Sequence, residues 1–148
     1  MRIGIVYTSV SGNTEELARL LHELLMEQKF RSQLINITDF PVHELAEYDA
    51  LAIGTYTWGD GEIPLEMETI YNKFKDLRSK EMVTAIFGTG DRFYPHYCGA
   101  VDTFKNVLKI NTNLAVTLKV ELLPQKRDLS KCKKFVELFT KRIQTSLQ

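Results

Sequence analysis

The chain has 148 residues, enough for one compact domain whose core can enclose a small cofactor. Apolar residues make up 44% and charged residues 26%, which excludes a disordered chain, and no apolar run approaches the roughly 18 residues of a membrane span. Nineteen Lys and Arg balance nineteen Asp and Glu, and this net charge of zero argues against a general nucleic-acid binder.

Short apolar segments alternate with amphipathic ones along the whole chain. The periodicity predicts strands at residues 3–7, 33–37, 50–53, 83–87 and 114–122, and helices at 15–28, 65–77, around 101–108 and around 132–143. Strands that are apolar on both faces are typical of a parallel sheet between two layers of helices. Because no linker or repeat interrupts the pattern, we expect one α/β domain over residues 1–148, with a doubly wound five-stranded parallel sheet and helices on both faces.

The loop after the first strand is Ser9-Val10-Ser11-Gly12-Asn13-Thr14. Its hydroxyls, its glycine and the free amides of a helix start favour an anion site. Since it contains neither Lys nor Arg, it suits one monophosphate held by neutral donors better than a nucleoside triphosphate. The alternative is an ordinary capped helix start.

The loop after the third strand contains the only tryptophan of the chain, in the run Thr55-Tyr56-Thr57-Trp58-Gly59-Asp60-Gly61. A planar side chain among glycines at a loop apex favours packing against a planar heterocycle. The alternative is ordinary packing of Trp58 in the core.

The loop after the fourth strand extends from Gly88 to Asp102. It fails as a dinucleotide fingerprint because Phe93 stands where the third glycine belongs. Carboxyl ends of parallel strands are where ligands bind in such sheets, so we expect this loop to face the other two.

Taken together and in this order, the three loops resemble those of flavodoxins. Residues 5–14 are similar to the family's phosphate loop, residues 57–60 to the loop over one flavin face, and residues 88–102 to the loop over the other face. The resemblance covers the whole chain. It implies the strand order 2-1-3-4-5 and non-covalently bound FMN, and the uninterrupted fifth strand resembles the short-chain subfamily.

The resemblance also implies which residues hold FMN. Side chains of Ser9, Ser11, Asn13 and Thr14, with backbone amides of the same loop, would contact the phosphate. Trp58 and Tyr94 would cover the two flavin faces, and the Gly59–Asp60 peptide would turn its carbonyl toward flavin N5. The other implied cofactor contacts are Val10, Gly12, Thr55, Tyr56, Thr57, Gly61, Thr89, Gly90, Asp91, Tyr97 and Cys98.

By the same resemblance the protein is a low-potential, one-electron carrier and not an enzyme. The implied partners are a flavin-containing NADPH reductase or other low-potential donor, and acceptors such as haem monooxygenases or desaturases, with no nucleic acid or membrane. Two alternatives stay open: an FMN activator of ribonucleotide reductase, and an FMN-dependent quinone or azo reductase. Close cover of both flavin faces argues against the reductase, and the run Thr57-Trp58-Gly59-Asp60 argues against the activator.

We expect a cytoplasmic monomer. Cys98 and Cys132 lack the spacing of metal ligands or redox pairs, so they are interpreted as reduced thiols, and the N-terminal segment does not resemble a secretion signal. Cys98 is expected to pack near the flavin as a small apolar residue and not as a nucleophile.

The net charge of zero, and the presence of Arg92 and His96 in the third loop, depart from the family pattern. Two features of the charge distribution each have two interpretations. Residues 125–148 carry seven Lys and Arg against two Asp and Glu, whereas residues 1–124 carry twelve against seventeen. This imbalance is either a solvated face of the last helix or a dipole that orients the molecule toward a partner. Arg92 either stabilises negative charge at the pyrimidine edge of the flavin or pairs with a surface acid.

Overall fold

The computed structural model describes residues 1–147. Its core is one sheet of five strands, which are β1 (Ile3–Tyr7), β2 (Gln33–Asn36), β3 (Ala50–Thr55), β4 (Val83–Gly90) and β5 (Asn113–Glu121). All neighbouring strands pair in parallel, in the order β2-β1-β3-β4-β5. The predicted doubly wound sheet and its strand order are confirmed.

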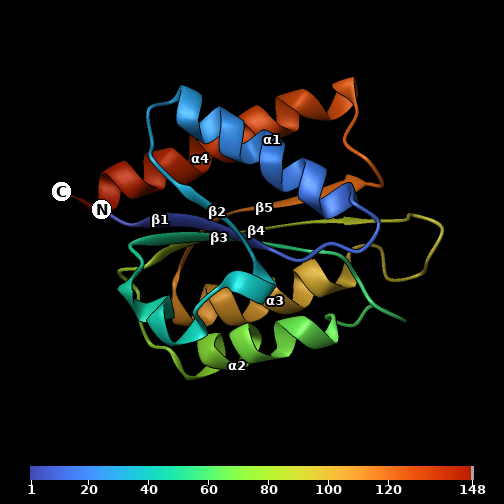
Figure 1. Ribbon diagram of the computed structural model, residues 1–148, viewed down its shortest axis with the longest axis horizontal. Coiled ribbons are helices and arrows are strands. Elements are labelled where there is room, and N and C mark those ends of the chain that lie inside the picture. Colours follow the sequence, from blue (N-terminus) through green and yellow to red (C-terminus); the bar gives the residue numbers. More distant parts are fainter. Residues whose placement is uncertain (148) are drawn as a thin grey trace.

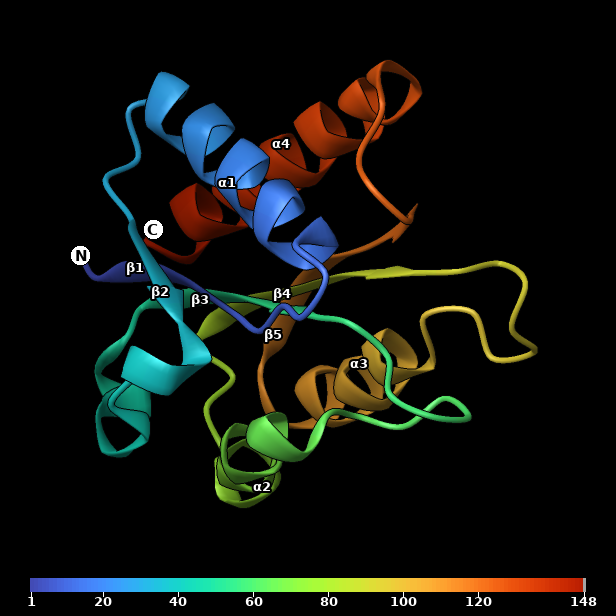
Figure 2. The same ribbon diagram turned by 45° about the vertical axis from the view of Figure 1, so that its right-hand side comes forward.

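Helices cover both faces of the sheet. Helices α1 (Asn13–Glu27) and α4 (Leu129–Ser146) pack on one face, and α2 (Glu68–Asp76) and α3 (Gly99–Asn111) pack on the other (Figures 1 and 2). Each face has its own buried apolar cluster, which explains why the inner strands are apolar on both sides. The carboxyl ends of β1, β3 and β4 all lie at the right-hand edge in Figure 1.

Several element boundaries differ from those that the periodicity predicted. The segment predicted as a helix at 65–77 begins as a 3₁₀ turn, η3 (Leu65–Met67), because it follows Pro64, whose extended backbone ends the preceding loop. Strand β2 stops at Asn36, whose side-chain oxygen accepts a hydrogen bond from the Thr38 N–H at 3.1 Å and so starts the 3₁₀ segment η1 (Ile37–Asp39). Two other 3₁₀ segments, η2 (Val42–Glu47) and η4 (Lys126–Asp128), were not predicted.

Close packing at the sheet edge depends on two glycines. A Cβ on Gly54 of β3 would lie 2.3 Å from the Phe87 ring, and a Cβ on Gly88 of β4 would lie 2.4 Å from the Thr55 carbonyl oxygen. β3 and β4 therefore approach each other closely at the ends from which their loops begin.

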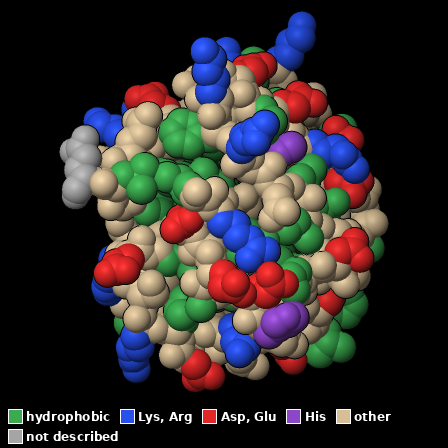
Figure 3. All heavy atoms as spheres, turned by 60° about the vertical axis from the view of Figure 1, so that its left-hand side comes forward, with side chains coloured by type: hydrophobic (Ala, Val, Ile, Leu, Met, Phe, Trp, Pro, Cys, Tyr) green, Lys and Arg blue, Asp and Glu red, His purple; other side chains and the backbone are tan. Residues whose placement is uncertain are grey.

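Surface charge is mixed on the side where the N-terminus lies. Acidic and basic side chains alternate there, with small apolar areas between them (Figure 3). Within residues 1–147 no helix has both the length and the apolar character needed to cross a membrane.

Candidate functional site

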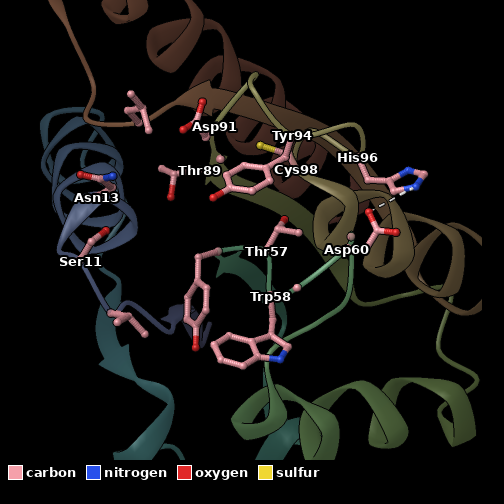
Figure 4. Close-up of a pocket in the computed structure, with 16 residues that line it drawn as sticks. Ser11, Asn13, Thr57, Trp58, Asp60, Thr89, Asp91, Tyr94, His96 and Cys98 are labelled. Atoms are coloured by element: carbon pink, nitrogen blue, oxygen red, sulfur yellow. Dashed lines mark ion pairs between the residues drawn. The ribbon is translucent and has the colours of Figure 1, made fainter.

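The loops that follow β1, β3 and β4 enclose a cavity of about 420 Å³ at the carboxyl edge of the sheet (Figure 4). Most of the predicted site residues line it. These are Val10, Ser11, Asn13, Tyr56, Thr57, Trp58, Gly59, Asp60, Gly61, Thr89, Gly90, Asp91, Tyr94 and Cys98. The predicted residues that do not line the cavity are Ser9, Gly12, Thr14, Thr55 and Tyr97.

The polar side chains of the loop after β1 lie in two different environments. Ser11 and Asn13 face the cavity, as Figure 4 shows. The Ser9 hydroxyl instead accepts a hydrogen bond from the Glu15 N–H at 3.2 Å. The buried Thr14 hydroxyl lies 2.7 Å from that of Thr89 and so ties the start of α1 to β4. Ser9 and Thr14 thus shape the loop in this structure.

Gly12 lets the chain turn into α1 with a φ of +96°, and a Cβ there would meet nothing within 4 Å. The first turn of α1 also contains Glu15 and Glu16, but no Lys or Arg of the described chain lines the cavity. An anion at this end would be held by neutral donors and by the positive end of the α1 dipole.

Trp58 is held at the cavity mouth by a tight turn. The Trp58 and Glu62 N–H groups each donate to the other residue's carbonyl at 2.8 Å, and Gly59 and Gly61 turn the chain with φ values of +51° and +91°. The Trp58 side chain faces the cavity although it is 60% exposed (Figure 4). The neighbouring Thr57 hydroxyl accepts a hydrogen bond from the Ala100 N–H at 3.2 Å, which ties this loop to α3.

Tyr94 borders the same cavity from the loop after β4 and is 64% exposed (Figure 4). The backbone below it is fixed by Asp91, whose carboxylate accepts from the Phe93 N–H at 2.9 Å and whose carbonyl accepts from the Tyr94 N–H at 3.1 Å. Two large aromatic side chains from separate loops therefore face one space.

Two lining residues, His96 and Leu122, were not among the predicted cofactor contacts. His96 lies 3.7 Å from Asp60, so the pair bridges the loops after β3 and β4 (Figure 4). Leu122 follows β5, and its N–H donates to the Gly90 carbonyl at 2.9 Å. In the predicted strand order the end of β5 lies beside the end of β4. That order could have indicated that Leu122, which follows β5, lies near the cavity.

Arg92 does not line the cavity. Its guanidinium lies 5.0 Å from the centre of the Tyr97 ring and 4.0 Å from the Glu121 carboxylate, and its side chain is 62% exposed. The interpretation in which Arg92 faces the flavin edge is therefore wrong in this structure, and the surface ion pair is the correct alternative. Tyr97 itself packs against the core below Arg92, and burial raises the pKa of Tyr97 to about 12.

A further cluster lies below the cavity and was also missed. The Glu66 carboxylate accepts hydrogen bonds from Thr8 at 2.6 Å and from the cavity-lining Tyr56 at 2.8 Å. Burial opposes ionisation of Glu66, but these hydrogen bonds and one from the backbone outweigh it and lower its pKa. Burial, together with the hydrogen bond to Glu66, raises the pKa of Tyr56 to about 12.

Cys98 lines the cavity floor and is 1% exposed. Burial raises the pKa of its thiol to about 11, which suits the expected packing role and not that of a nucleophile.

The donor set fits FMN. The cavity combines an uncharged anion site at a helix start with two exposed aromatic side chains, and its volume lies within the roughly 300–1,000 Å³ usual for small-molecule sites. Such a site on a doubly wound sheet defines a small α/β flavoprotein.

The flavodoxin family model matches residues 5–135, and the chain belongs to the flavodoxin family. Probable flavodoxin 1 of Bacillus subtilis (strain 168) is 40% identical over 139 residues, covering 91% of this chain and 87% of that protein. The crystal structure of oxidised flavodoxin 1 from Bacillus cereus superposes with a TM-score of 0.88 at 33% identity, covering 95% of this chain and 98% of that one.

A larger protein also contains a similar region. The NADPH sulfite reductase flavoprotein alpha-component of Photorhabdus laumondii is 35% identical over 112 residues, 72% of this chain but 18% of that protein. Family membership makes this chain an FMN-binding electron carrier and not an enzyme, which favours the carrier over the two alternatives.

Proposed function

We propose that the protein holds one FMN non-covalently in the described cavity and carries single electrons at low potential between a flavin-containing reductase and acceptor redox enzymes. The observation that carries the proposal is the pairing of Trp58 and Tyr94, which come from different loops and face one cavity. Both are more than half exposed, and large aromatic side chains that border a pocket supply area for a planar ligand.

Ser11, Asn13 and the free amides at the start of α1 would hold the phosphate. Trp58 and Tyr94 would pack on the ring system and exclude water from it. FMN supplies the one-electron redox chemistry, and the protein supplies binding, orientation and electrostatics. Glycine at position 59 keeps the Gly59–Asp60 peptide free to turn, because a φ of +51° costs glycine little.

Acidic groups around the cavity would set the potential low. Asp60 and Asp91 line it, Glu62 pairs with Trp58 in the turn, and Glu66 lies hydrogen-bonded below Tyr56. Their negative charge disfavours addition of electrons to a nearby group, and the effect is strongest where water is excluded.

The proposed classes of redox partner are supported by family membership and by one relative. A region similar to this chain occurs within a flavoprotein component whose name includes sulfite reductase and NADPH. This supports a flavin-containing NADPH reductase as electron donor. Acceptors would be enzymes that need electrons one at a time, such as haem monooxygenases or desaturases.

Titration of the flavin-free protein with FMN and with riboflavin, followed by quenching of flavin fluorescence, tests the proposal. Ser11→Ala should weaken FMN by about tenfold or more, since a hydrogen bond to a charged group contributes roughly 1.5–3 kcal/mol. Riboflavin, which lacks the phosphate, should bind Ser11→Ala and wild type alike.

Ser130→Ala serves as the matched control, because Ser130 is exposed on α4 and does not line the cavity. Failure of the wild type to bind FMN would refute the proposal. Equal losses for FMN and riboflavin would place the phosphate elsewhere.

A further inference from the structure

A cationic surface lies beside the cavity, along the end of β5 and the start of α4. Arg92, Lys119, Arg127 and Lys131 line a depression of about 390 Å³ there. Lys126 lies next to Arg127 in the adjoining depression. These five side chains are called the β5–α4 surface below.

The acids near the β5–α4 surface only partly neutralise it. One carboxylate, Glu121, lies 4.0 Å from Arg92 and 3.8 Å from Arg127, so it is shared between two guanidinium groups. Asp102 pairs with Lys119 at 2.8 Å.

The third nearby acid, Asp128, is buried and accepts a hydrogen bond from the Gln125 N–H at 2.8 Å. Within residues 1–147, Lys126 and Lys131 have no carboxylate within 4.0 Å. Five cations thus face three acids, and the surface keeps an excess of positive charge.

The β5–α4 surface is continuous with the cavity mouth. Leu122 lines both the cavity and the depression beside Arg127. Leu122 and Leu123 are each more than two-fifths exposed, and Phe93, next to Arg92, is 94% exposed. Exposed apolar side chains rimmed by charged ones are typical of protein docking sites.

The loop and turn that follow β3 contain acidic side chains instead. Asp60, Glu62 and Glu66 follow β3 there, and none of them pairs with a Lys or Arg among the described residues. The loop after β3 thus contributes acidic side chains near the cavity, whereas the β5–α4 surface that adjoins the cavity at Leu122 is cationic.

We propose that the β5–α4 surface docks a redox partner protein that presents an acidic patch around its own electron-transfer centre. The inference rests on the proposed function, because a carrier must bring its cavity mouth close to a redox partner. Charge complementarity steers such encounters and fixes which edge of the carrier meets the partner. A small free anion is disfavoured because it would meet Glu121, which lines both depressions.

Calorimetric binding to the FMN-loaded protein tests the docking site. The probes are a small acidic [2Fe–2S] ferredoxin and a small basic c-type cytochrome. The test variant, Arg127→Gln with Lys131→Gln, removes two cations of the β5–α4 surface. The matched control, Lys133→Gln with Lys141→Gln, removes two exposed cations of the same helix that line neither depression.

At an ionic strength of about 0.1 M, where charges act over about 10 Å, the test variant should bind ferredoxin about tenfold more weakly than wild type. The control should stay within about twofold of wild type, and at about 1 M salt, with a Debye length of about 3 Å, the difference should vanish. Binding of the basic cytochrome should not weaken in the test variant, since it would meet the acidic side chains that follow β3.

If ferredoxin binding weakened equally in the test variant and in the control, the loss would be explained by net charge alone, and the proposal would be overturned. So would ferredoxin that fails to bind wild type, or a dimer in sedimentation that the test variant abolishes, because the surface would then pair two copies. Flavin absorbance is read on every sample. A wild type without FMN refutes the proposed function, while ferredoxin binding to that same sample still decides the docking site.

Discussion

At the scale of single residues, the turn that carries Trp58 contains two glycines with different surroundings. A Cβ on Gly59 would find only Glu62 Oε2, at 4.0 Å, whereas a Cβ on Gly61 would lie 2.8 Å from the Cβ of His96. Gly99 packs on the same spot, since its own Cβ would lie 2.8 Å from the Cα of Gly61. Gly61 is thus where the loops after β3 and β4 touch.

Substitution by alanine should therefore destabilise the protein to a different extent at each of the two positions. Gly59→Ala should lower the free energy of unfolding by about 1 kcal/mol, the strain of a left-handed conformation alone. Gly61→Ala should cost about 2 kcal/mol or more, because overpacking adds to that strain. Urea denaturation measures both, and equal losses would mean that the two loops separate freely.

Glu66 gives stability a pH dependence of known sign. Its pKa is lowered from an ordinary value of 4.5, so its contribution is present above that pH and is lost as the pH falls through the folded pKa. Thr8→Val removes the 2.6 Å hydrogen bond and should lower stability by about 1 kcal/mol at pH 7. The difference from wild type should shrink as the pH falls through the folded pKa of Glu66, which lies below 4.5.

The exposed Thr69 of α2 offers a control, Thr69→Val, with the same chemical change and no such bond. A Thr8→Val effect that is constant from pH 7 to acid would show that Glu66 does not respond to Thr8.

At the scale of elements, α3 begins unusually. Its N-cap residue is Cys98, a buried non-glycine residue with a φ of +52°. A helix N-terminus normally lowers the pKa of a thiol, but here burial dominates and the pKa of Cys98 is about 11. Burial raises the pKa of Cys132 on α4 to about 11 as well.

Both thiols should therefore resist a disulfide reagent such as DTNB in the folded protein at pH 8, because thiolate is scarce and access is closed. In denaturant, two thiols per chain should react within minutes. One fast-reacting thiol in the native state would show that the cavity floor opens to solvent.

At the scale of the whole molecule, the cavity exists only because distant segments meet. Hydrogen bonds between Thr14 and Thr89 and between Thr57 and Ala100 join the three loops, and the His96–Asp60 pair adds a third contact. A ligand that contacts all three loops should consequently stabilise the global fold.

FMN at a hundred times its Kd should raise the free energy of unfolding by about 2.7 kcal/mol, by mass action on the folded state. Thermal denaturation at several FMN concentrations measures this. A midpoint that does not move with FMN would mean that the cavity does not take the cofactor.

The sequence by itself determined the architecture, because strand and helix periodicity is local and each apolar strand requires cover on both faces. It also located the three loops, since the first ends in a run without cations, the second contains the only tryptophan, and all follow strands whose carboxyl ends meet. Trp58, Tyr94, Ser11 and Asn13, which the family resemblance implies as cofactor contacts, line the cavity.

Only the tertiary structure decided what each polar side chain of those loops contacts. Thr14 meets Thr89, Arg92 meets Glu121, and Glu66 meets Thr8, and each pair is separated by many residues in the chain. Local patterns carry no information on such pairings, because a side chain's direction depends on backbone turns and on neighbours supplied by other strands. The β5–α4 surface likewise forms only because β5 and α4 fold next to Arg92 in the loop after β4.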